Sequence, residues 1–280
     1  MMLQQRLPRI AGITAGCLCL FLVFTYLFFP IGRIDGIINQ ELASQGLSLA
    51  PGASKTILPG LSWKGLRLSS DQGALVACDR LKVRLRLLPL LMGTVRLDAR
   101  ASVGSGKLDL EYGVTGAKAL DLDISGINLA DIPFFKTVLG AKAGGTLWSQ
   151  GSVLRGAKGL NGELKLEVRQ LEFSGMKLGA FPLPDAANLR SQGMIRVTNG
   201  RGRLESFTLQ GEGIYMRLSG DIPSGTNAAA APLNLVLEIM PKPEFLENQK
   251  LVFLLLAKFM VSPGVYTVPI RGTLLKPEIL

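Results

Sequence analysis

Residues 81–87 read LKVRLRL, and this strict alternation of apolar and basic side chains decides the fold class. Successive side chains of a β-strand point to opposite faces, so the segment has one apolar face and one charged face. The sequence therefore predicts a mainly β protein. The same period of two recurs in the segments 66–68, 95–100, 108–112, 120–124 and 164–168. The segments 171–176, 194–197, 203–211, 215–222, 233–239, 266–270 and 272–275 also indicate strands.

The connections between these segments are short. Residues 102–106 and 115–118 contain glycine and are too few for a crossover helix, which favours antiparallel neighbours. About ten strands would each have an apolar face, whereas only one or two short helices could cover them. We expect a curved antiparallel sheet that either folds onto itself as a sandwich or forms an open trough with an apolar groove for acyl chains. The candidate groove residues are Leu97, Leu110, Leu122, Leu164, Leu166, Leu235 and Leu237.

Residues 10–29, IAGITAGCLCLFLVFTYLFF, contain no charged side chain. About 20 apolar residues in a helix span the hydrocarbon core of a bilayer. Arg6 and Arg9 precede the segment, so the positive-inside rule predicts one transmembrane helix with a cytoplasmic N-terminus and an exported remainder. The alternatives are a cleaved signal peptide and a lipoprotein signal ending at Cys17. The apolar run is longer than a signal core and ends in FFP, which suits a signal peptidase poorly.

The chain divides where its pattern changes. Ile34, Ile37, Ile38 and Leu42 recur at helical spacing after the anchor, and residues 224–232, SGTNAAAAP, form a low-complexity linker. Residues 244–260 predict a helix packed on the sheet, because their apolar run is too short for a second span. The expected divisions are a cytoplasmic tail and transmembrane anchor (1–33), a membrane-proximal helix and loop (34–60), a first β unit (61–130), a hinge helix (131–145), a second β unit (146–223), and a linker, helix and closing strand (224–280).

Little in the sequence indicates catalysis. The chain has no histidine, which removes the usual catalytic triads, histidine-ligated zinc sites and histidine acid–base chemistry. The segment GSGK at 104–107 lacks the first glycine of a phosphate-binding loop and has Leu108 where such a loop needs Ser or Thr. Asp121 and Asp123 share one strand face, as residues of a solvated sheet surface do. We expect no enzymatic activity, no cofactor and no metal.

The cysteine content and the net charge further restrict the class of protein and the partners that we expect. Cys17 and Cys19 lie in the predicted anchor and Cys78 is alone in the exported part, so no disulfide framework is expected. The net charge of +10 suits a protein beside anionic lipid headgroups. Basic and acidic residues are interleaved and form no aromatic-rich basic patch, so nucleic acid is not an expected partner.

The hairpin at 81–101 has an apolar tip between basic flanks. We expect either that the tip enters a membrane while the basic residues meet headgroups, or that it is a loop buried against the core. The candidate membrane-contact residues are Leu87, Leu88, Leu90 and Leu91 at the tip and Lys82, Arg84 and Arg86 beside it.

Two pairs of longer phrases carry a family resemblance. Residues 159–184, GLNGELKLEVRQLEFSGMKLGAFPLP, and 189–223, LRSQGMIRVTNGRGRLESFTLQGEGIYMRLSGDIP, have a strand pattern that resembles AsmA-like envelope proteins. The closing phrases are LNLVLEIMP at 233–241 and VPIRGTLLKPEI at 268–279. Together with the single anchor and the β-rich body, they resemble the type II secretion system protein N family over most of residues 5–280.

The resemblance to the protein N family implies a Gram-negative inner-membrane protein with a periplasmic body. It implies a non-catalytic component of the type II protein secretion machinery that contacts other secretion subunits. The AsmA-like resemblance implies an alternative, a module that binds or transfers phospholipid between the inner and outer membranes. Both readings make the inner membrane a partner, and neither family transfers a catalytic residue to this chain.

Overall fold

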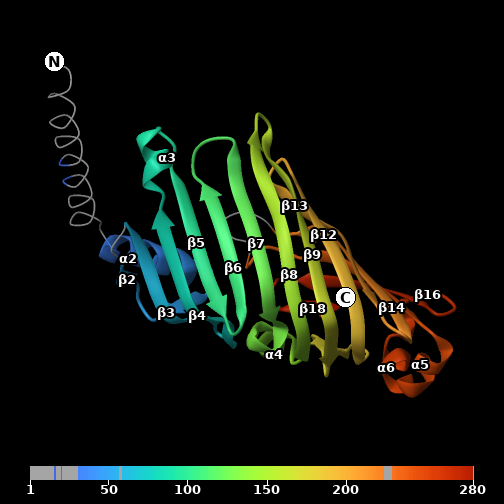
Figure 1. Ribbon diagram of the computed structural model, residues 1–280. Coiled ribbons are helices and arrows are strands. Elements are labelled where there is room, and N and C mark those ends of the chain that lie inside the picture. Colours follow the sequence, from blue (N-terminus) through green and yellow to red (C-terminus); the bar gives the residue numbers. More distant parts are fainter. Residues whose placement is uncertain (1–15, 17–19, 21–30, 57–58, 224–228, 280) are drawn as a thin grey trace, which may run out of the picture.

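The computed structural model describes Gly16, Leu20 and residues 31–56, 59–223 and 229–279. One antiparallel sheet of sixteen strands dominates this part of the chain, so the prediction of a mainly β protein is confirmed (Figure 1). A separate small sheet joins β10 (Lys177–Leu178) and β11 (Phe181–Pro182). The strands of the large sheet are β1 (Leu47–Ala50), β2 (Ser54–Lys55), β3 (Gly60–Ser70), β4 (Gly73–Leu85), β5 (Arg96–Val103), β6 (Gly106–Gly113), β7 (Lys118–Asn128), β8 (Lys142–Gly156), β9 (Gly159–Ser174), β12 (Ala186–Thr198), β13 (Arg201–Gln210), β14 (Ile214–Ile222), β15 (Asn234–Pro241), β16 (Met260–Ser262), β17 (Val265–Gly272) and β18 (Pro277–Ile279).

The helices are short, and the described residues contain more of them than the one or two expected. No helix in this part of the chain is both long and apolar enough to cross a membrane. The predicted anchor at 10–29 lies outside the described residues except for Gly16 and Leu20. The helices are α2 (Ile31–Ser44), α3 (Leu87–Leu91), α4 (Phe134–Leu139), α5 (Pro243–Asn248) and α6 (Lys250–Leu255), with the 3₁₀ turns η1 (Leu129–Asp131) and η2 (Ala257–Phe259).

Strand order follows chain order across most of the sheet. From β3 to β9 each strand pairs with the strand that precedes it, and β12 to β15 continue the same meander. Local connections of this kind are the usual way to build an antiparallel sheet. Strands β7 and β8 pair directly although α4 lies between them in the sequence, so residues on both sides of the expected hinge share one sheet.

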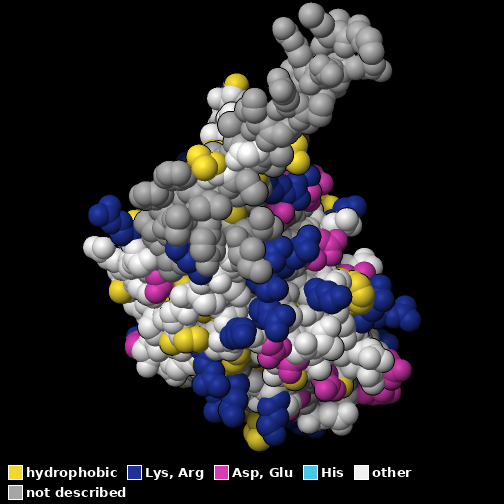
Figure 2. Space-filling model, turned by 60° about the vertical axis from the view of Figure 1, so that its left-hand side comes forward, with side chains coloured by type: hydrophobic (Ala, Val, Ile, Leu, Met, Phe, Trp, Pro, Cys, Tyr) yellow, Lys and Arg dark blue, Asp and Glu magenta, His cyan; other side chains and the backbone are white. Residues whose placement is uncertain are grey.

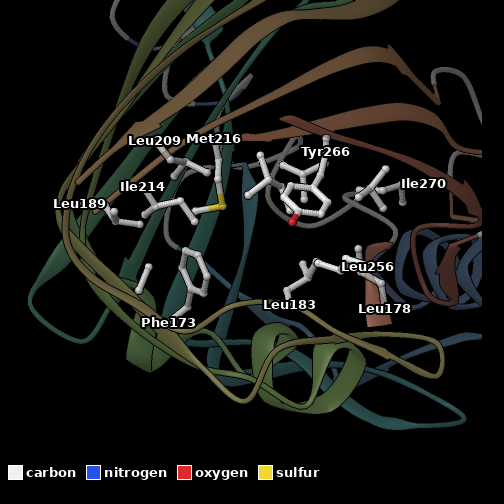
Figure 3. Close-up of a cluster of buried hydrophobic side chains, with 14 of the residues drawn as sticks. Phe173, Leu178, Leu183, Leu189, Leu209, Ile214, Met216, Leu256, Tyr266 and Ile270 are labelled. Atoms are coloured by element: carbon white, nitrogen blue, oxygen red, sulfur yellow. The ribbon is translucent and has the colours of Figure 1, made fainter. Parts of the chain in front are cut away.

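The register places the apolar side chains of successive strands on one face. Leu110 of β6 lies opposite Leu122 of β7, which lies opposite Gly151 of β8, which in turn lies opposite Leu164 of β9. Direct cross-strand partners point to the same side of a sheet, so this face stays apolar from strand to strand. The sheet curves around it, and Figure 3 shows apolar side chains gathered inside the curve. We call this side the concave face and the opposite, charged side the outer face.

The core is densest at the end of the sheet that carries α4, α5 and α6, the lower end in Figure 1. Here Leu189, Ile239 and Val268 on the concave face are at most 1% exposed. Phe253 and Leu256 of the α6 region join the same cluster, and Leu178 and Leu183 add side chains from the segment around β10 and β11 (Figure 3). These connections therefore cover the lower part of the concave face.

Helix α2 covers the other edge of the concave face. Ile34 and Ile38 pack against a small buried cluster of Leu61, Trp63 and Leu66 on β3. The helix ends before Gly46, which adopts a positive φ of 72° that glycine tolerates without strain. The helical spacing that Ile34 and Ile38 show in the sequence thus corresponds to the buried side of a real helix.

Three local expectations differ from the structure. Strand β8 was not predicted from the sequence. Residues 273–276 form a turn between β17 and β18, so the closing strand does not run through Leu275. The expected helix at 244–260 is broken into α5, α6 and η2, and Gln249 at the break has φ −125° and ψ 36°, outside the helical range.

Candidate functional site

All seven candidate groove residues lie on the concave face. Leu97 pairs with Tyr112, Leu166 with Gly193, and Leu237 with both Leu218 and Val268, all on this side of the sheet. Six of the seven are half-buried, and Leu237 is buried at 5% exposed because it belongs to the lower core. The structure thus brings residues separated by up to 140 positions in the sequence onto one apolar surface.

Burial on the concave face changes along the strands. At the lower end of β5, β7 and β9, Val103, Ile127 and Val168 are buried. Toward the end that carries α3, the upper end in Figure 1, the floor residues of β5, β6 and β7 are half-buried and Tyr112 of β6 is exposed, whereas Val153 of β8 and Leu204 of β13 are buried. The concave face is therefore covered below, and above it is accessible over β5 to β7.

Small residues of β8 occupy the middle of this floor. Gly151 stands between Leu122 and Leu164, and a Cβ there would lie 2.2 Å from the Glu163 carbonyl oxygen and 2.8 Å from Leu164 Cδ2. A larger residue has no room, because its Cβ would meet the backbone of β9 at Glu163 and Leu164. The neighbouring buried hydroxyl of Ser149 donates a 2.9 Å hydrogen bond to the Lys165 carbonyl, so it leaves no unpaired polar group in the floor.

The outer face carries ion pairs between neighbouring strands. The Arg86 guanidinium lies 2.8 Å from the Asp98 carboxylate and 3.2 Å from that of Glu111, which Arg96 also contacts at 3.1 Å. The hydrogen bond to Asp98 raises the pKa of Arg86 above its already high usual value. Figure 2 shows Lys and Arg side chains gathered on the side of the molecule near β3 and β4, with fewer acids between them. Arg86 and Arg96 are thus held by Asp98 and Glu111 across neighbouring strands.

A hollow of about 670 Å³ lies mainly over polar side chains of the outer face. Asp123, Lys165 and Gln192 line it, and the Arg169 guanidinium lies 5.2 Å from the centre of the Trp148 ring at its border. A stacked arginine of this kind is a common way to cover an exposed indole. The described residues contain no group of three Cys, Asp or Glu side chains that could hold a metal ion.

Some of the candidate membrane-contact residues are exposed, whereas others are half-buried or held in ion pairs. Leu88 and Leu91 of α3 are 77% and 64% exposed, so the tip of the hairpin is not buried against the core. Leu87 and Leu90 on the same helix are half-buried, as is Lys82 on β4. Arg84 is exposed, whereas Arg86 is held in the ion pairs described above.

Two further groups of apolar residues are exposed. Met92, which belongs to the apolar tip of the hairpin, is 80% exposed, and Val114 and Leu154, which the sequence did not single out, are exposed at the same end of the sheet. In the sequence, Val114 and Leu154 are single apolar residues next to a polar turn, and such residues look like the last residue of an alternating strand. A second group lies on and after α6 at the lower end, where Leu251 and Leu254 are exposed although the predicted helix was expected to pack on the sheet.

No family model matches the chain, and no match is found among the curated proteins or the solved structures compared with it.

Proposed function

We propose that this chain is a non-catalytic protein of the bacterial inner membrane whose exported sheet is an open trough that holds acyl chains of phospholipid. The observation that carries the proposal is the half-buried apolar floor formed by Leu97, Leu110, Leu122, Leu164 and Leu166 on strands β5, β6, β7 and β9. Residues 10–29 would anchor the protein, with the N-terminus in the cytoplasm and the sheet in the periplasm.

An acyl chain fits this floor better than a peptide does. Transfer of apolar surface from water gains about 25 cal/mol for each Å² buried, and an acyl chain brings no backbone groups that need hydrogen-bond partners. The hydroxyl of Ser149 is the buried polar side chain nearest the middle of the floor, and it is already bonded to backbone. The AsmA-like strand pattern of residues 159–223 supports the same assignment.

A second candidate function is a structural role in the type II protein secretion system. The resemblance of residues 233–241 and 268–279 to the protein N family supports it, and the charged outer face offers a surface for other subunits. The two functions can coexist, because one uses the concave face and the other the outer face. Cross-linking of the anchored protein in cells, followed by identification of secretion subunits at outer-face positions, tests the second function.

The lipid-holding function is tested by the phospholipid content of the purified full-length chain. We expect lipid in the parent protein, detected by mass spectrometry after extensive washing in detergent. Leu166→Glu and Leu235→Glu place a charge on the half-buried floor, where water can reach it, so both variants should stay folded and lose lipid. Val268→Glu is the matched control, because a charge at a fully buried site should unfold the sheet.

The outcomes separate the two shapes of the sheet. Folded floor variants without lipid support the open trough. Unfolding of the floor variants along with Val268→Glu, with no lipid in the parent, supports a closed sandwich. In that case the secretion role alone would remain.

A further inference from the structure

A row of exposed apolar side chains lies along the upper end of the sheet. Leu88, Leu91 and Met92 stand on or beside α3. Val114 directly follows β6, and Leu154 lies near the end of β8, where it pairs with Lys118 at the start of β7. We call these five residues the upper rim. Apolar side chains that gather on one surface, beyond scattered single ones, mark a contact site for a protein or a membrane.

Basic groups flank the upper rim. Arg84 lies at the end of β4 just before α3, and Lys158 lies in the turn between β8 and β9; both are exposed. Neither forms an ion pair with another residue that the structure describes. Arg155 stabilises the loop beside Val114 instead. Its guanidinium donates hydrogen bonds of 3.2 Å to the Gly113 carbonyl oxygen and 3.0 Å to the Gly116 carbonyl oxygen.

Helix α2 begins at the same end of the sheet. Asp35 of α2 accepts a 3.4 Å hydrogen bond from the amide of Ala53, next to β2, which pairs with Leu61 and Ser62 at the start of β3. The amide of Leu85, two residues before α3, bonds to the carbonyl of Pro59. The other end of α2 leads to Leu47, which pairs with Ser70 at the lower end. Helix α2 therefore begins beside the first residues of β3 and runs toward the lower end of the sheet.

We propose that the upper rim docks into the periplasmic leaflet of the inner membrane, with its apolar side chains among acyl chains and with Arg84 and Lys158 at anionic headgroups. The proposal rests on the proposed anchor and trough. Apolar groups beside basic ones are the composition of surfaces that lie in a bilayer interface. An anchor that enters at the upper end would hold this rim against the membrane. Docking would place the accessible end of the trough, near Tyr112, against the lipid that it takes up.

A position-specific depth measurement on the full-length chain tests the docking. Cys17, Cys19 and Cys78 are replaced by alanine, and a single cysteine is introduced as Met92→Cys for an environment-sensitive nitrobenzoxadiazole label. The protein is reconstituted in vesicles of phosphatidylethanolamine and phosphatidylglycerol that contain nitroxide-labelled acyl chains. Leu251→Cys is the matched control, because Leu251 is 79% exposed and lies at the lower end. We expect blue-shifted, lipid-quenched emission at position 92 and water-like, unquenched emission at position 251.

Charge variants then test the role of the headgroups. Neutralising one basic residue near an anionic surface shifts association by about fivefold, so Arg84→Gln and Lys158→Gln should each reduce docking by about that factor. The reduction should disappear in vesicles made of phosphatidylcholine alone. Emission at position 92 that matches position 251, whether both labels are quenched or both lie in water, would overturn the docking.

The same vesicles separate this proposal from the proposed function. Retention of the protein in the membrane after carbonate extraction reports on the anchor, and co-purified phospholipid reports on the trough. Docking with no bound phospholipid would overturn the trough and leave the docked rim. Bound phospholipid with an undocked position 92 would overturn the rim and leave the trough.

Discussion

Leu110 of β6 and Leu122 of β7 are direct cross-strand partners on the concave face, and both are half-buried although each lies in the middle of its strand. In a closed core, residues at such positions are covered by the opposite layer. At the lower end that is the case, since Leu189 and Val268 are almost fully buried in one cluster. The difference in burial between Leu110 and Leu122 on one side and Leu189 and Val268 on the other is the structural basis of the proposed trough.

Truncation of leucine should measure this difference directly. Leu189→Ala removes a side chain that is 1% exposed and should lower the free energy of unfolding by about 2–5 kcal/mol, because the transfer and cavity effects add. Leu122→Ala removes a half-buried side chain that is already partly hydrated and should cost about 1 kcal/mol. Urea unfolding of both variants, with lipid removed by detergent, gives the comparison. Equal losses would show that Leu122 is packed as tightly as the lower core.

The thiol of Cys78 should be less reactive than that of an unfolded chain. Burial raises the pKa of Cys78, and the neighbouring Asp79 carboxylate raises it further, so the neutral thiol is favoured in the folded protein. In a variant with Cys17→Ala and Cys19→Ala, alkylation by iodoacetamide at pH 8 should be slower than in the same chain in urea. Folded and unfolded chains that react at the same rate would contradict the burial of this side chain.

The same shift predicts a dependence of stability on pH. The unfolded thiol titrates near a pKa of about 8.5, and the folded thiol titrates higher. The contribution of Cys78 to stability is therefore fully present below the unfolded pKa and is lost as the pH rises through the folded pKa. The difference in unfolding free energy between the parent and Cys78→Ala should shrink as the pH is raised above 9. A difference that grows with pH would reverse the sign of the shift.

The membrane topology is testable with fusions. Alkaline phosphatase needs an oxidising compartment to form its disulfides. A fusion after Leu280 should be active in a Gram-negative host, and a fusion after Gln5 should be inactive, because Arg6 and Arg9 hold the N-terminus in the cytoplasm. The opposite pattern of activities would overturn the proposed location of the sheet.

The sequence predicts the concave face well, for a clear physical reason. Antiparallel pairing keeps the alternation of neighbouring strands in phase, so Leu110 and Leu122 share a side on adjacent strands, and Leu164 shares it through Gly151 of β8. Strand β8 escaped prediction because Ser149 and Gly151 stand where an alternating strand would carry apolar residues. The close approach of β8 and β9 leaves no room for a side chain at Gly151.

Features that depend on distant contacts were not predictable from local pattern. The break between α5 and α6 coincides with Gln249, whose side chain exchanges two 2.8 Å hydrogen bonds with the backbone of Asp185, 64 residues away. The coverage of the lower end depends on such contacts, and so does the exposure of the upper rim. No periodicity in the chain encodes which end of the concave face stays accessible.

Site-specific photo-crosslinking tests the trough most directly. A benzoylphenylalanine placed at position 122 or 164 of the full-length protein in cells would lie on the concave face. The matched controls are the next residues in the chain, Asp123 and Lys165, which are exposed on the outer face. The trough predicts ultraviolet-induced adducts to phospholipid at 122 and 164 and none at 123 and 165. Adducts at the outer positions alone, or no lipid adduct at any of the four, would contradict it.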